Sequence, residues 1–143
     1  MGESVTLRFG SSTLSFVTEE NGWTNVYLIK DGTTAYLGSD DKQTIIQRLL
    51  EMLTRQDQAK MGNIGGIDVR WVLTLSEKYH VLYASYKAGD GSVRVFWQDA
   101  GTLNKIIDES VLDVDCQTVL IKSLKSELSS IQNTPRTGSD TTT

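Results

Sequence analysis

The chain has very little histidine and cysteine, the residues that build disulfides and many metal sites. Its 143 residues include one histidine, His80, and one cysteine, Cys116. A single cysteine excludes an intramolecular disulfide and favours a reducing compartment, and a single histidine excludes a metal site built from several histidines. Apolar runs are only a few residues long, so the sequence predicts neither a membrane span nor a secretory signal. We therefore expect a cytoplasmic protein.

An excess of positive charge is also missing. Fourteen lysines and arginines stand against eighteen acids, which gives a net charge of −4 and a pI near 4.9. A protein with this net charge has no overall positive electrostatic potential that would attract nucleic acid or anionic lipid. A partner of either kind would therefore need a local basic patch. The hydrophobic content of 38% and charged content of 22% are ordinary for a folded chain. The sequence predicts one α+β domain over residues 1–131.

Alternation of apolar and polar residues predicts four strands near the N-terminus, over residues 5–9, 14–17, 23–30 and 33–37. The dipeptides Asn21-Gly22 and Asp31-Gly32 favour two-residue type I′ turns, which would fix the register of the strands around them. With that register, the residues predicted to face the core are Val5, Leu7, Leu14, Phe16, Tyr27, Ile29 and Tyr36. Those predicted on the opposite face are Thr6, Arg8, Ser15, Val26, Leu28 and Leu37.

The strongest pattern lies over residues 67–98, where segments 67–75, 79–87 and 92–98 have the alternation of three antiparallel strands. We place two-residue loops between these strands, at Glu77-Lys78 and at either Gly89-Asp90 or Asp90-Gly91. With these loops, the apolar residues of all three strands lie on the same face of the sheet. The residues predicted on this core face are Val69, Trp71, Leu73, Leu75, Leu82, Ala84, Tyr86, Val93, Val95 and Trp97.

Helical spacing of apolar residues occurs in three segments. Residues 40–55 follow the capping run Ser39-Asp40-Asp41. Thr102 is expected to begin a short helix that holds Leu103, Ile106 and Ile107. Asp113 or Asp115 is expected to cap a final amphipathic helix that holds Cys116, Val119, Leu120, Leu124, Leu128 and Ile131. We interpret the glycine-containing segment 55–66 as a frayed helix end and a linker. Residues 132–143 have no apolar residue to bury and are predicted to be a disordered tail.

The predicted fold is α+β, in the order ββββ-α-βββ-α-α, with helices packed on largely antiparallel sheets of about seven strands. A unit of four strands and a helix, used twice, resembles the sheet platforms of Whirly and Pur-type single-stranded nucleic-acid binders. The whole order also resembles the globular heads of the end-joining repair scaffold superfamily and a pleckstrin-like barrel, and residues 27–98 resemble roadblock and longin modules. These resemblances concern element order and imply no functional residue.

No catalytic constellation emerges from the sequence. We interpret His80 as a structural histidine near a strand end, and Cys116 as a small hydrophobic residue on a helical stripe. The acids Asp108, Glu109, Asp113 and Asp115 precede the final helix, where capping and solvation explain them. We therefore predict a non-enzymatic protein with no metal and no cofactor.

The candidate site is the second face of the 67–98 strands, where aromatic and cationic residues interleave. It consists of Arg70, Tyr83, Lys87, Arg94 and Phe96. If helices cover this face, Tyr83 and Phe96 belong to the core. If it is open, it suits a protein interface or a base-stacking platform.

The acidic net charge favours protein over nucleic acid as the ligand. The predicted function is a non-catalytic interaction module, such as a small regulator, inhibitor or adaptor. It would bind a protein partner or a second copy through an exposed sheet face or the C-terminal amphipathic helix. The alternative is a single-stranded nucleic-acid-binding protein that uses the aromatic and basic sheet face.

Overall fold

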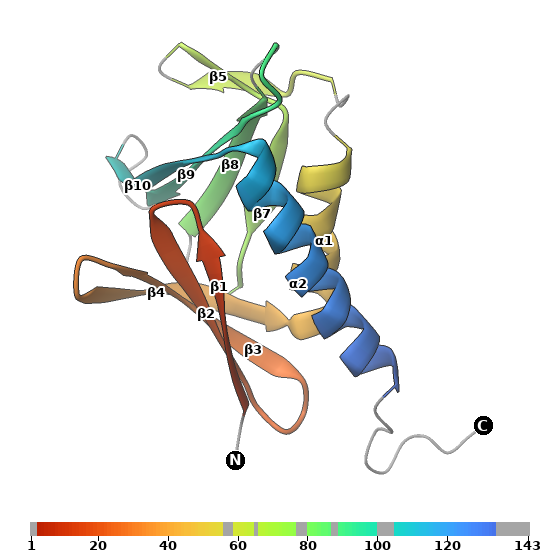
Figure 1. Ribbon diagram of the computed structural model, residues 1–143. Helices are drawn as coiled ribbons and strands as arrows, with labels where there is room; N and C mark the ends of the chain where they lie inside the picture. Colours follow the sequence, from red (N-terminus) through yellow and green to blue (C-terminus); the bar gives the residue numbers. More distant parts are fainter. Residues whose placement is uncertain are drawn as a thin grey trace.

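The computed structural model describes residues 3–55, 59–64, 66–76, 80–86, 89–99 and 105–133. Along the chain, the elements are β1 (Glu3–Phe9), β2 (Ser12–Thr18), β3 (Trp23–Lys30), β4 (Thr33–Asp41), α1 (Lys42–Thr54), β5 (Gly62–Ile64), β6 (Ile67–Val69), β7 (Trp71–Thr74), β8 (His80–Tyr86), β9 (Val93–Asp99), β10 (Lys105–Leu112) and α2 (Val114–Asn133). The strands form a first sheet β1-β2-β3-β4, a second sheet β10-β9-β8-β7 and a small hairpin β5-β6. Figure 1 shows α1 and α2 lying side by side against these sheets.

The mixed α and β class with antiparallel sheets is confirmed, but the predicted number and order of strands are wrong. The supposed linker contains β5, whose Gly62–Ile64 backbone pairs with β6. The single strand predicted over residues 67–75 is divided at Arg70, because β6 pairs with β5 whereas β7 pairs with β8.

The short helix predicted around Ile106 and Ile107 is replaced by β10, which pairs along β9. A register shift between Ile106 and Asp108 interrupts the alternation that would have marked this segment as a strand. Thr102 and Leu103 lie outside the described residues. The described elements thus contain a four-strand-and-helix unit twice, first as β1 to α1 and again as β7 to α2.

The face of the first sheet that packs on the core is the one predicted to face away from it. The loop after β2 is the cause. The Glu19 N–H donates to Trp23 O (2.8 Å), the Gly22 N–H donates to Glu19 O (2.9 Å), and Gly22 has a φ of 89°. The loop therefore has three residues and is closed by a left-handed glycine, instead of the expected two-residue turn. Phe16 pairs with Val26 in place of Tyr27, and a slip of one residue moves every side chain of β3 to the other face.

The buried apolar residues of the first sheet are Leu7, Phe9, Leu14, Phe16, Val26, Leu28 and Leu37, whereas Tyr27, Ile29 and Tyr36 are only half-buried. The turn at Asp31-Gly32 is the predicted type I′ turn, since φ is 52° and 78° at its two residues and Lys30 pairs with Thr33. Leu37 is an extra residue between the pairs Tyr27–Tyr36 and Val26–Gly38. This bulge directs Leu37 inward, where it is fully buried.

The second sheet has the predicted register between β7 and β8, and between β8 and β9 it has the alternative set by a loop at Gly89-Asp90. Trp71 pairs with Ala84, Leu82 with Trp97, and Tyr86 with Val93. Trp71 and Trp97 are 1% and 2% exposed, as the alignment of apolar faces predicted.

Both long helices begin at aspartate caps near the predicted positions. Asp41 accepts a hydrogen bond from Thr44 N (3.2 Å), and Asp113 accepts one from Cys116 N (2.8 Å). Leu120 and Leu124 of α2 are buried, but Val119 is 63% exposed, so its assignment to the apolar stripe is wrong. The helix also continues through Asn133, two residues into the predicted tail, whereas residues 134–143 lie outside the described part of the chain.

One hydrophobic core connects the helices with the inner faces of both large sheets. The sheets also meet at two places through serines. Ser39 and Ser76 exchange backbone hydrogen bonds (3.0 and 2.9 Å), and Ser11 shares a side-chain hydrogen bond with Ser110 (3.0 Å). At Gly10, beside Ser11, an added Cβ would lie 2.6 Å from Ser110 Cβ, so a larger residue would separate β10 from the β1–β2 turn.

Candidate functional site

The structure brings together only part of the predicted site on the second sheet. Tyr83 and Phe96 are paired across β8 and β9 with ring centroids 5.3 Å apart, and Arg94 makes an ion pair with Glu109 on the same face. Phe96 has no exposed surface, because its cross-strand neighbours Tyr83 and Glu109 flank it. Its ring is therefore inaccessible to a partner in this conformation.

The other two predicted residues add little to this face. Arg70 is half-buried at the division between β6 and β7, where its backbone N–H donates to Ala84 O (3.0 Å). Lys87 lies outside the described residues. Among the members of this set that the structure describes, Arg94 is an exposed cation, and Glu109 neutralises it.

A different sheet face carries half-buried aromatic residues, and sequence reasoning had placed its tyrosines in the core. It is the outward face of the first sheet. The helices and the second sheet contribute their buried residues to the core on the inward side, which leaves this face to solvent among the described elements. We call it the tyrosine face, and define it by Val17, Trp23, Asn25, Tyr27, Ile29 and Tyr36, all half-buried.

The strand registers arrange the outward residues in four cross-strand rows. The first row is Arg8, Thr13, Ile29 and Thr34; the second is Thr6, Ser15, Tyr27 and Tyr36; the third is Ser4, Val17, Asn25 and Ser39; the fourth is Glu19, Trp23 and Asp41. Aromatic and apolar side chains thus gather on β3 and its two neighbours, hydroxyl groups surround them, and charges stand at the two ends.

Contacts between neighbours hold the side chains of the tyrosine face in place. The Tyr27 and Tyr36 rings lie 5.4 Å apart, and the Tyr36 hydroxyl donates to Asn25 Oδ1 (3.4 Å). Asn25 Nδ2 donates in turn to Glu19 Oε2 (3.2 Å). Trp23 Nε1 donates to Ser39 Oγ (2.9 Å), so its ring is fixed across β4. A partner would meet an ordered surface and would pay little side-chain entropy to bind it.

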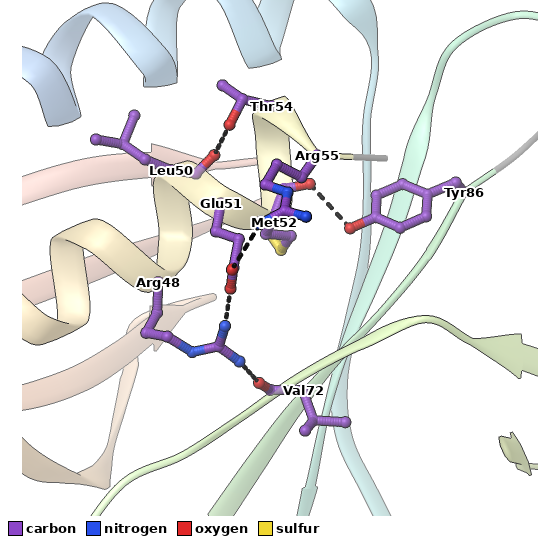
Figure 2. Close-up of polar contacts among 8 residues, drawn as sticks. All are labelled: Arg48, Leu50, Glu51, Met52, Thr54, Arg55, Val72 and Tyr86. Carbon is purple, nitrogen blue, oxygen red and sulfur yellow. Dashed lines mark hydrogen bonds and ion pairs between the residues drawn. The ribbon is translucent and has the colours of Figure 1, made fainter. Parts of the chain in front are cut away.

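A cluster at the C-terminal end of α1 also joins polar groups, and Figure 2 shows why it is structural. Arg48 pairs with Glu51, donates to the backbone oxygen of Val72 and lies over the Trp71 ring, 5.0 Å from its centroid. The Tyr86 hydroxyl donates to Met52 O (2.9 Å), a carbonyl near the end of α1. Burial raises the pKa of Tyr86 to about 12, against the opposing effect of the Arg48 charge. These contacts attach α1 to the second sheet.

A second charged cluster has the same kind of role. Lys42, at the start of α1, is almost fully buried and binds Glu3 of β1 (2.9 Å) and Glu127 of α2 (3.0 Å). Burial lowers the pKa of Lys42, but hydrogen bonds and charges from both glutamates outweigh burial and raise it above its ordinary value. The ammonium group therefore ties three elements together as a cation.

The groups with chemical reactivity remain scattered. His80 is half-buried on β8, and Cys116 is half-buried against the core in the first turn of α2. Within the described ranges, histidine, cysteine and carboxylate side chains form no group of three that could hold a metal ion. Neither helix of that part is long and apolar enough to cross a membrane.

Comparisons with known proteins add no family to this picture. A scan against protein-family models and a search of curated proteins both found no match to this chain.

Proposed function

We propose that this protein is a non-catalytic protein-interaction module that binds through the tyrosine face. The observation that carries the proposal is the outward pair Tyr27 and Tyr36, which lies with Trp23 and Ile29 on the side of the first sheet that faces away from the core. Antiparallel sheets with one solvated face normally have polar residues on that face. Exposed aromatic residues in such a place are typical of interfaces.

The composition of the face favours protein over nucleic acid. Tyrosine, tryptophan, serine, threonine and asparagine are the residues that dominate antibody paratopes, because they combine apolar contact with adaptable hydrogen bonds. A nucleic-acid groove needs several cations to pair with phosphates. The four rows of this face contain one cation, Arg8, together with the acids Glu19 and Asp41.

Site-directed photocrosslinking in the native source tests the proposal. Tyr27 is replaced by the photoreactive residue p-benzoylphenylalanine, and the matched control carries the same residue at Lys122, an exposed position on α2. We expect protein adducts from position 27 and few from position 122. We also expect Ile29→Asp to suppress the adducts that form from position 27. Equal labelling at both positions would contradict the proposal.

A single-stranded nucleic-acid binder is the second candidate, supported by the unit of four strands and a helix that occurs twice. This order resembles the sheet platforms of Whirly and Pur-type proteins, and Tyr27 and Tyr36 would serve as stacking groups. Fluorescence anisotropy with a labelled oligothymidine at increasing salt separates the candidates, because phosphate contacts make affinity fall steeply with salt. Salt-sensitive binding that Tyr27→Ala abolishes would favour nucleic acid over protein.

A further inference from the structure

We propose that the partner of the tyrosine face is a second copy of the same chain, packed face to face about a twofold axis that runs across the strands. This inference rests on the proposed function and names its partner. Because a twofold interface brings one patch against itself, the patch must be self-complementary. The tyrosine face meets that condition in charge and in shape.

The charges are arranged for such a pairing. Arg8 stands in the first row, on β1, and Glu19 stands in the fourth row, directly after the end of the neighbouring strand β2. Six residues separate these rows along β2, or roughly 20 Å of extended strand. A twofold axis across the strands places the first row of one copy over the fourth row of the other. Because this operation keeps each strand over itself, each Arg8 lies over the β1 end of the fourth row, one strand or about 4.8 Å to the side of Glu19 of the second copy. The long arginine side chain spans that offset, and the contact occurs twice.

The apolar residues follow the same pattern along β3. The operation that joins Arg8 to Glu19 also places Trp23 over Ile29 of the second copy and Tyr27 over Asn25. Large side chains therefore meet smaller or polar ones, as in interdigitated faces of stacked sheets. A twofold axis parallel to the strands would instead keep Arg8 over its own row, where Thr13, Ile29 and Thr34 offer no charge.

The size of the face sets the strength of the association. Four strands about 4.8 Å apart and roughly 20 Å long present on the order of 400 Å² of projected sheet per copy. Stable interfaces usually bury about 800 Å² of accessible surface per partner. We therefore expect a dimer that forms with increasing concentration and dissociates on dilution.

Charge reversal tests this geometry. Sedimentation equilibrium of the full chain is measured from about 1 μM to about 1 mM, a range that covers weak association. Arg8→Glu brings like charges together at both symmetric contacts, and so does Glu19→Arg. We expect either substitution to raise the dimer dissociation constant at least about tenfold. The control Lys122→Glu, an equal charge change at an exposed site on α2, should leave the constant unchanged.

Mixing the two variants gives the decisive result. An equimolar mixture of Arg8→Glu with Glu19→Arg restores attraction at both contacts, so a heterodimer should form where neither variant dimerises alone. Labelling one variant with ¹⁵N allows native mass spectrometry to distinguish the heterodimer from both homodimers. The double variant Arg8→Glu/Glu19→Arg should recover the homodimer.

The outcomes separate this inference from the function on which it rests. A wild-type chain that stays monomeric at the highest concentration, or a mixture without a heterodimer, overturns the self-association. If crosslinks from position 27 then join this chain to other proteins, the interaction module stands and only its partner differs. If position 27 gives no protein adduct and oligothymidine binds, both proposals are wrong.

Discussion

Adjacent residues of β3 provide a direct test of which face of the first sheet is buried. Leu28 is 5% exposed and points into the core, whereas Ile29 is half-buried on the tyrosine face. Leu28→Thr removes about two to three buried carbons at roughly 0.8 kcal/mol each and places a hydroxyl in the core at a cost of about 1–3 kcal/mol. We expect Leu28→Thr to lower the free energy of unfolding by roughly 3–5 kcal/mol.

Ile29→Thr keeps a β-branched side chain, so strand propensity is preserved. Because solvent already reaches Ile29, we expect a loss of about 1 kcal/mol or less. Urea unfolding followed by tryptophan fluorescence measures both values, and equal slopes against urea would show that the denatured states are comparable. A larger loss for Ile29→Thr than for Leu28→Thr would mean that Asn21-Gly22 is a two-residue turn after all. The tyrosine face would then be inside, and both proposals would lose their basis.

Other substitutions test the second sheet and its contact with α1. Phe96→Ala should cost roughly 3–5 kcal/mol, as should Trp71→Ala and Trp97→Ala, because all three rings are buried; urea unfolding measures each, and a loss below about 1 kcal/mol at Phe96 would mean that this ring is accessible. Stability should fall as the pH rises from 10 to 12, since the folded chain holds the Tyr86 proton to about 12 while the unfolded chain releases it near 10. The raised pKa of Lys42 acts in the same direction. Thermal melts across this range should show a shallower fall for Tyr86→Phe, and an unchanged slope would exclude Tyr86 as a cause.

How much of the fold could be predicted depended on how tightly each loop fixed its register. In the second sheet, three strands had to agree about one apolar face, and both loops considered after β8 put the tryptophans at positions 71 and 97 on that face. In the first sheet, the register between β2 and β3 depended on a single loop. Asn21-Gly22 occurs in two-residue and three-residue hairpin loops alike, and the two differ by one position in register. The hydrogen bonds of Glu19 that distinguish them involve backbone atoms, which residue types do not report.

The strand β10 was missed for a different reason. Ile106 and Ile107 are adjacent in the sequence, so the segment lacks the strict alternation of a strand, and the pairing of β10 shifts by one residue between Ile106 and Asp108. The predicted site depended on whether the outer face of the second sheet was open, and alternation alone cannot decide that. Phe96 is enclosed by its neighbours on β8 and β10, and β10 was the strand absent from the prediction.

The sequence of β3 shows an apolar residue set on each face of the strand, whichever register the strand adopts. Both alternating sets of this strand are apolar: Val26 and Leu28 in one, and Tyr27 and Ile29 in the other. A strand needs only one apolar set to pack on a core, and the second set must then face another surface. Here the inward set is satisfied by the helices and the second sheet. The outward set is left half-buried beside Trp23 and Asn25, whose side chains hydrogen-bond to Ser39 and Tyr36 of β4. Such a set is costly to expose to water, so the apolar surplus of β3 points to a surface that covers it in the assembled state.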